Sequence, residues 1–209
     1  MLEVGSRGDA LLAALLAVKN TPRTGWMLRG VPAAIAETIA AHMAESAILA
    51  LVIADGLRMR GIDVSPEESA AIALVHDVSE GFLGDIVKRA VDEIGREAKE
   101  RAELRVASQE FGEDSILYNL LKHYVEQDSA EALVAKVAEQ LSTMLQALRY
   151  RQDGYPVEEI LCNIYGAVKR TVQADEALRV ALENVLEDLF GKAFRETDKA
   201  CKTYKKDRE

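Results

Sequence analysis

Helix-breaking residues are scarce in this chain, and their scarcity constrains its fold more than any other feature. Proline occurs at only four of the 209 positions: Pro22, Pro32, Pro66 and Pro156. The long intervals between these prolines are rich in alanine, leucine and glutamate, which are strong helix formers. The sequence therefore predicts an all-α protein, with a chain long enough to bury one sizeable hydrophobic core.

We expect one domain over residues 1–209, because no repeat, low-complexity segment or Pro/Gly/Ser-rich linker divides the chain. Additional helices are expected over 151–198, and the charged tail over 199–209 is expected to fray. The expected helices are Ala10–Val18, Ala36–Arg60, one from Pro66 to about Gly81 or Gly84, one over 88–110, Ser115–Val125, Ser129–Tyr150, Val157–Arg170 and Ala174–Glu196.

The start of the third expected helix carries strong signals. Ser65 is a good N-cap, Pro66 suits the first helical position, and Glu68 would close a capping box. By contrast, the highly charged stretch over 88–110 is typical of a solvated amphipathic helix rather than of a binding surface.

Bulk properties exclude some classes of function. A net charge of −9 argues against a general nucleic-acid-binding surface, which needs a basic stripe. The apolar runs Ala10–Val18 and Ala47–Ala54 are too short to span a bilayer, and the N-terminus does not resemble a signal peptide. Cys162 and Cys201 fit no metal or redox spacing. We therefore expect a cytoplasmic protein in which both thiols are reduced.

Two histidines in apolar surroundings indicate a metal site. His76 and Asp77 follow the apolar run 70–75, which should place them in the inner part of a buried helix. A buried aspartate is costly unless a cation or hydrogen bonds compensate its charge. His42 lies on a second apolar helix. A lone core histidine is usually structural, but two helices that each bring a histidine into one core are typical of a metal site assembled by packing.

Two further carboxylates follow the His76-Asp77 pair. Glu80 is four residues after His76 and so lies on the same helical face, where it could orient a metal-activated water and accept its proton. Asp85 follows Gly84 in an expected loop and could reach the same cavity. A histidine elsewhere, His123, is more typical of a surface or helix-capping residue than of a ligand. The tyrosines 118, 124 and 150 are more typical of core or rim residues than of a base-stacking platform.

Three separated motifs resemble the HD-domain metal-dependent 5′-deoxynucleotidases. The resemblance covers roughly residues 12–150. The motifs are Pro22-Arg23-Thr24-Gly25-Trp26, the segment ALVHDVSEGFLGDI over 73–86, and a late signature of Tyr124 to Ala132 followed by Lys136 and Leu145-Gln146-Ala147.

The resemblance implies a single HD-domain helical bundle with the metal site in its core. It assigns metal ligation to His42, His76 and Asp77, and places Glu139 where the family has an aspartate as fourth ligand. A glutamate is one methylene longer, so the backbone must adjust or the fourth bond must be weak. A second departure is Ala41, which precedes His42 where the family usually has an acidic residue.

The resemblance also implies residues for the substrate. Glu80 matches the residue that handles the attacking water, and Asp85 the second acidic residue of the motif. Arg23 and Trp26 match residues that grip phosphate and shape the sugar pocket. Arg29 is a second candidate for the phosphate contact.

These features together favour a metal-dependent phosphohydrolase that releases phosphate from a small-molecule substrate, a nucleoside 5′-monophosphate, preferably a deoxyribonucleotide. One divalent cation, Mn²⁺, Co²⁺, Fe²⁺ or Zn²⁺, suits the mixed nitrogen and oxygen ligands. The resemblance suggests a homodimer. Two alternatives stay open: an HD-class phosphodiesterase acting on another nucleotide, and a non-catalytic nucleotide- or metal-binding HD protein.

Overall fold

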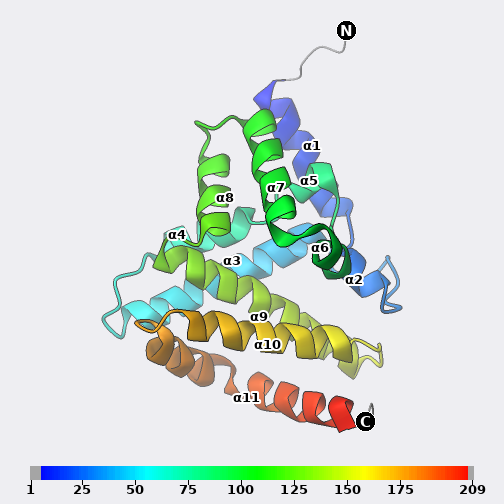
Figure 1. Cartoon of the computed structure of the whole chain (residues 1–209), viewed down its shortest axis with the longest axis vertical. Coiled ribbons are helices and arrows are strands. Elements are labelled where there is room, and N and C mark those ends of the chain that lie inside the picture. The colour runs from blue at the N-terminus through cyan, green and yellow to red at the C-terminus, as the bar shows by residue number, and fades with distance from the viewer. Residues whose placement is uncertain (1–5, 207–209) are drawn as a thin grey trace.

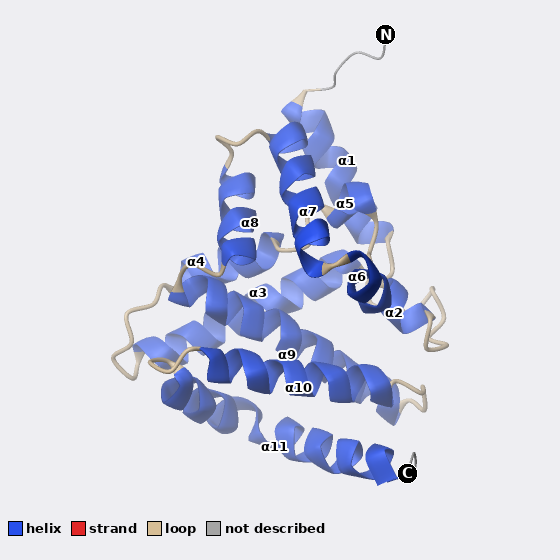
Figure 2. Ribbon diagram, viewed as in Figure 1, coloured by secondary structure: helices blue, strands red, loops and turns tan. Residues whose placement is uncertain are grey.

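The computed structural model describes residues 6–206, and within them every regular element is a helix (Figure 2). This confirms the predicted all-α fold. The helices are α1 (Arg7–Asn20), α2 (Thr24–Met27), α3 (Ile39–Arg58), α4 (Pro66–Val75), α5 (Glu80–Leu83), α6 (Lys88–Ile94), α7 (Arg96–Phe111), α8 (Ile116–Glu126), α9 (Ala130–Gln152), α10 (Glu158–Ala174) and α11 (Arg179–Lys206).

The helices surround two adjoining hydrophobic cores. The larger core lies among α3, α4, α9, α10 and α11, and α9, α10 and α11 form successive layers in the lower half of Figure 1. The smaller core lies where α1, α7 and α8 meet the start of α3 and the end of α4. His42 and His76 stand where these two cores adjoin, because α3 and α4 contribute to both.

Helix α3 is the central helix and packs against α4 and α9. Its length and apolar composition would also suit a membrane span, although the sequence analysis expected its apolar run to be too short. In the structure one face of α3 is fully buried in the larger core through Ala50, Ile53, Ala54 and Leu57. These contacts account for the apolar residues on that face of α3 as part of a protein core.

The start of α4 was predicted correctly, but half of its capping box was not. The Ser65 hydroxyl accepts a hydrogen bond from the Glu68 amide, as expected of an N-cap. The Ser65 amide, however, donates to Glu131 in the first turn of α9, at 2.8 Å, instead of to Glu68. The hydrogen bond from the Ser65 amide therefore links the start of α4 to the start of α9.

The end of α4 corrects the sequence analysis. The helix stops at Val75, so His76 is its C-cap and Asp77 lies in the turn that follows, not in a helix interior. The Ala73 carbonyl, which a continued helix would offer to the Asp77 amide, accepts a bond from the His76 Nδ1 atom at 2.7 Å. A side chain thus competes with the helical hydrogen bond, and the chain turns between α4 and α5.

Two other boundaries differ from expectation. The charged stretch over 88–110 forms two helices, because Gly95 between α6 and α7 has φ of 90°, a conformation that favours glycine. The segment after Pro22, expected as a loop, contains the short helix α2. The C-terminal tail continues α11 as far as Lys206 instead of fraying after residue 198, and 207–209 lie outside the described residues.

Cys162 on α10 and Cys201 on α11 form a disulfide, so the prediction of reduced thiols is wrong. The two residues are 39 positions apart in sequence, but the packing of α10 on α11 brings their Cα atoms to 5.4 Å. This separation suits a disulfide. Disulfides are rare in reducing compartments, so the expected cytoplasmic location loses one of its supports.

Candidate metal centre

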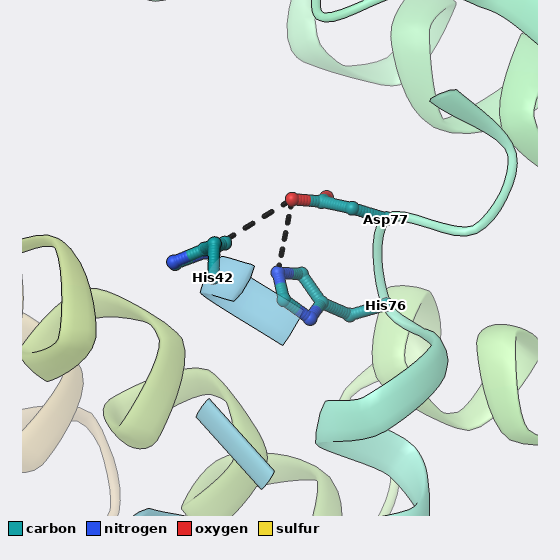
Figure 3. Close-up of side chains that lie close together, drawn as sticks. All are labelled: His42, His76 and Asp77. Atoms are coloured by element: carbon teal, nitrogen blue, oxygen red, sulfur yellow. Dashed lines mark ion pairs between the residues drawn. The ribbon is translucent and has the colours of Figure 1, made fainter. Parts of the chain in front are cut away.

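Three predicted ligands converge on one point in the structure. His42 comes from α3, His76 caps α4, and Asp77 follows it (Figure 3). Their ligand atoms all lie within 4.8 Å of one another. Asp77 Oδ2 is 3.1 Å from His76 Nε2 and 4.0 Å from His42 Nε2, and the two imidazole centroids are 5.1 Å apart. This spacing allows all three to reach one cation at bond lengths of about 2.1 Å.

Hydrogen bonds fix the tautomer of both imidazoles. His76 Nδ1 faces the Ala73 carbonyl, which can only accept, so this nitrogen carries the proton. His42 Nδ1 lies 3.1 Å from Ser142 Oγ, and that hydroxyl donates to Glu45 Oε2 at 3.0 Å. Because the hydroxyl has one proton, it must accept from His42 Nδ1. In each ring Nε2 is therefore the nitrogen left to bind a cation.

Both Nε2 atoms are buried and have no hydrogen-bond partner. Burial, followed by the positive charge of Arg23, holds the pKa of His42 well below its usual value, so this ring is neutral. Burial alone would lower the pKa of His76 as well, but the Asp77 charge raises it, so a proton and a cation would compete for His76 Nε2. Two orphaned imidazole nitrogens facing one carboxylate fit a divalent metal ion.

Glu80 lies beside this cluster with one free oxygen. Its side chain is 5% exposed, its Oε1 is 3.4 Å from Lys99 Nζ, and its buried Oε2 has no hydrogen-bond partner. Burial, followed by the negative charge of Asp77, raises the pKa of Glu80 to about 9. With Asp77 and Glu103 it forms a second group of carboxylates within 4.8 Å. Lys99 also pairs with Glu103, and its ammonium offsets part of this charge.

A family model described as HD domain matches residues 16–180. This chain belongs to the HD-domain family.

Several proteins resemble this HD-domain chain. The human 5′-deoxynucleotidase HDDC2 is 36% identical over 138 residues, which are 64% of this chain and 63% of the human protein. The chain thus spans less than two thirds of that relative's length. The Danio rerio 5′-deoxynucleotidase HDDC2 is 32% identical over 145 residues, covering 66% of this chain and 68% of that protein. The crystal structure of the PH0347 protein from Pyrococcus horikoshii has a TM-score of 0.73 at 30% identity, covering 90% of this chain and 98% of that one.

In this HD domain, the segment between α1 and α2 brings Arg23 towards the metal centre. Its Nη1 donates to Glu37 at 3.3 Å and to Thr143 on α9 at 3.1 Å. Burial lowers the pKa of Arg23, but the charges of Glu37 and then Asp77 outweigh this effect and raise it, so the guanidinium is held charged close to the metal site. Trp26, 2% exposed, donates to the same Glu37 and packs edge-on against Tyr150. Its contact with a sugar therefore stays a prediction.

Asp85 and Arg29 occupy different surroundings. Asp85 accepts a hydrogen bond from the Thr24 amide at the start of α2, so it ties the loop after α5 to the segment that carries Arg23. Arg29 pairs with Glu159 on α10 at 2.6 Å, and this partner is not among the cluster residues. The structure therefore brings Asp85 into the neighbourhood of Arg23 but gives Arg29 another partner.

Glu139 is not one of the residues whose ligand atoms converge, which are His42, His76 and Asp77. Its Oε1 is 2.8 Å from Lys136 Nζ, which also donates to the Tyr124 hydroxyl at 2.9 Å. The Tyr124 ring packs on the His76 ring with centroids 5.1 Å apart. Ligation by Glu139 stays a prediction. His123, 44% exposed, pairs with Asp128 at 2.9 Å, as expected of a surface histidine.

Lys99 and Glu103 are site residues that the sequence analysis missed. The inward face of α7 has a spacing of four residues and runs from Phe111 through Ala107 to Glu103, all buried. Continuing this spacing by one step reaches Lys99. The four-residue spacing of Phe111 and Ala107 could thus have predicted that Glu103 and Lys99 also face inward.

Proposed function

We propose that this HD-domain protein is a metal-dependent phosphohydrolase that releases phosphate from nucleoside 5′-monophosphates, with a preference for deoxyribonucleotides. The observation that carries the proposal is that the buried Nε2 atoms of His42 and His76 have no hydrogen-bond partner and both face Asp77. The names of the human and Danio rerio relatives, both 5′-deoxynucleotidases, support the substrate class.

A divalent cation held by His42, His76 and Asp77 would lower the pKa of a coordinated water and neutralise phosphate charge. Imidazole and carboxylate ligands suit Mn²⁺, Co²⁺, Fe²⁺ or Zn²⁺.

The remaining chemistry falls to the chain's own side chains. Glu80 has a free, buried oxygen that could accept a proton from the attacking water. In the metal-free protein its raised pKa keeps this group protonated at neutral pH, and the charge of a bound cation would favour the ionised form that acts as a base. Lys99 holds the other Glu80 oxygen and so orients the carboxyl group. Arg23 supplies positive charge for the phosphoryl oxygens. We assign to Asp85, which accepts a hydrogen bond from the amide of the residue after Arg23, the protonation of the leaving 5′-oxygen.

We also propose that the protein is a homodimer. An exposed apolar stripe on α3, formed by Ile48, Leu51 and Val52, supports a partner-binding surface on that helix. The molar mass in solution, measured by light scattering during size-exclusion chromatography, tests this; the mass of a single chain would contradict it.

Phosphate release from a panel of ribo- and deoxyribonucleoside monophosphates, with each metal supplied separately to metal-free protein, tests the activity. Release that requires one of the four metals and is faster with deoxyribonucleotides is expected. Turnover of a diester without monoester hydrolysis would favour the phosphodiesterase alternative. Tight nucleotide binding without turnover under any metal would favour a non-catalytic HD protein.

A further inference from the structure

A cavity of about 710 Å³ lies between α9, α10 and the start of α7. Its size falls in the range of small-molecule binding sites. We propose that this cavity receives the nucleoside part of the substrate and that Gln140 recognises the edge of the base. The inference rests on the proposed function and extends it to base selection.

Lys136 connects the cavity to the metal centre. It lines the cavity, and its ammonium contacts Glu139 and the Tyr124 hydroxyl, whose ring packs on His76. Gln140 follows Lys136 by one helical turn and so lies on the same face of α9. A substrate whose phosphate lies at the cluster can therefore extend past Lys136 towards Gln140.

Gln140 lines this cavity and has a side-chain oxygen without a hydrogen-bond partner. The residue is 6% exposed, and its buried Oε1 has no hydrogen-bond partner. A buried acceptor that is left unpaired destabilises the fold, so such groups usually have a ligand or another partner. A glutamine amide offers an acceptor and a donor side by side, which matches the adjacent amino group and ring nitrogen of a base edge.

The other walls have apolar side chains that suit a planar heterocycle. Small and apolar side chains, Ala130, Leu133 and Ala167, form part of the lining. The basic residues Lys136 and Arg96 are already paired, with Glu139 and Glu100 respectively. Two aspartates also line the cavity, at positions 128 and 175. A third basic residue, Arg170, also lines the cavity. An arginine guanidinium can stack on a base, and the separate phosphate titration shows whether these residues bind phosphate instead.

Equilibrium binding of the four 2′-deoxynucleosides, and separately of inorganic phosphate, to the metal-loaded protein tests the inference. Wild-type protein should bind the nucleosides with base-dependent affinities. Gln140→Leu, which keeps the side chain's size, should weaken the best-bound nucleoside about three- to tenfold, as expected for one hydrogen bond, and should narrow the differences among the four. Its affinity for phosphate should not change.

Gln173→Leu is the matched control, because Gln173 is exposed on α10 and does not line the cavity. It should match wild type with every ligand. Ala167→Phe, which fills the cavity from α10, gives a second test if Gln140→Leu does not fold. It should weaken all nucleosides and spare phosphate.

Nucleoside affinities that neither variant changes would overturn the inference, as would no nucleoside binding by wild type. A parallel loss of phosphate affinity would also overturn it, because the effect would not be confined to the cavity. These results are separable from the proposed function. Phosphate release without any effect of Gln140 would overturn only the cavity inference, whereas Gln140-dependent nucleoside binding without phosphate release from any monophosphate would overturn only the proposed activity.

Discussion

Ser142 holds His42 in the orientation that a metal ligand needs. Its hydroxyl lies 3.1 Å from His42 Nδ1 and donates its own proton to Glu45, which in turn pairs with Arg149 at 2.9 Å. The chain of bonds runs from the surface to the metal site, and it leaves His42 Nε2 as the free atom. A residue on α9 thus sets the chemistry of a ligand on α3.

Ser142→Ala should therefore weaken metal binding by about ten- to a hundredfold, the range for loss of a group that orients a ligand. Titration of metal-free protein measures this dissociation constant. Ser46→Ala is the matched control, since Ser46 is also buried but its hydroxyl has no hydrogen-bond partner to lose. Equal affinities in the Ser142 variant and wild type would contradict the orienting role.

Asp77 and Glu80 are expected to separate metal binding from turnover. Asp77→Ala removes a carboxylate that faces both imidazoles, so it should lower metal affinity by more than about a hundredfold. That is the upper limit for loss of a group that only orients a ligand. Glu80→Gln keeps the shape but removes the proton acceptor, so turnover should fall by about 10²- to 10⁴-fold while metal content stays the same. Elemental analysis and phosphate release distinguish the two; equal metal loss in both would make Glu80 a ligand.

The stability of the metal-free protein should depend on pH through Glu80. Its pKa is about 9 in the folded state, against 4.5 as the ordinary value. The folded state therefore binds an extra proton between these values, so the stability from this group is fully present below pH 4.5 and is lost as the pH rises towards 9. Denaturant unfolding in the presence of a chelator should show a smaller decline with pH for Glu80→Gln. Identical slopes would rule out the raised pKa.

The Cys162–Cys201 disulfide should contribute to stability by constraining the unfolded chain. A loop closed over 39 positions corresponds to about 4 kcal/mol. A reductant should lower the unfolding free energy of wild type by up to this amount. The double variant Cys162→Ser with Cys201→Ser should be insensitive to the reductant. Two free thiols in unreduced wild-type protein, detected by thiol titration, would show that the bond is absent.

Signals between adjacent residues predicted most of the helices. Where a helix boundary was not predicted, a contact with another part of the fold or with a side chain explains it. Ser65 and Pro66 mark the start of α4 because capping depends on adjacent residues. The end of α4 was missed because the Ala73 carbonyl accepts from the His76 side chain. No propensity scale contains such a bond.

The candidate site shows the same division. His42, His76 and Asp77 could be named because a buried histidine and aspartate are unusual in apolar segments. Lys99 and Glu103 could not, since their pairing with Glu80 depends on how α7 packs, and a charged helix resembles a solvated one. The disulfide between α10 and α11 likewise follows from helix packing and not from sequence spacing.

Glu139 allows a test in which two substitutions have opposite effects. In the structure its carboxylate pairs with Lys136, yet it also lies close enough to His76 for their charges to interact. Burial would raise the pKa of Glu139, but Lys136 and then His76 outweigh it and lower it, so the group is ionised and ready to bind a cation.

If Glu139 ligates the metal, Glu139→Ala should lower metal affinity by at least about tenfold. Loss of a group that only orients a ligand already lowers it by about ten- to a hundredfold. Lys136→Met should raise the affinity, because it releases the carboxylate from its ion pair. Glu139→Asp should retain binding with a shifted affinity, since the shorter side chain changes the reach towards the cation. Metal titration of the three variants decides between the two roles. Dissociation constants that stay at the wild-type value in both Glu139→Ala and Lys136→Met would show that Glu139 serves only its ion pair with Lys136, and that His42, His76 and Asp77 are the only protein ligands among the residues tested.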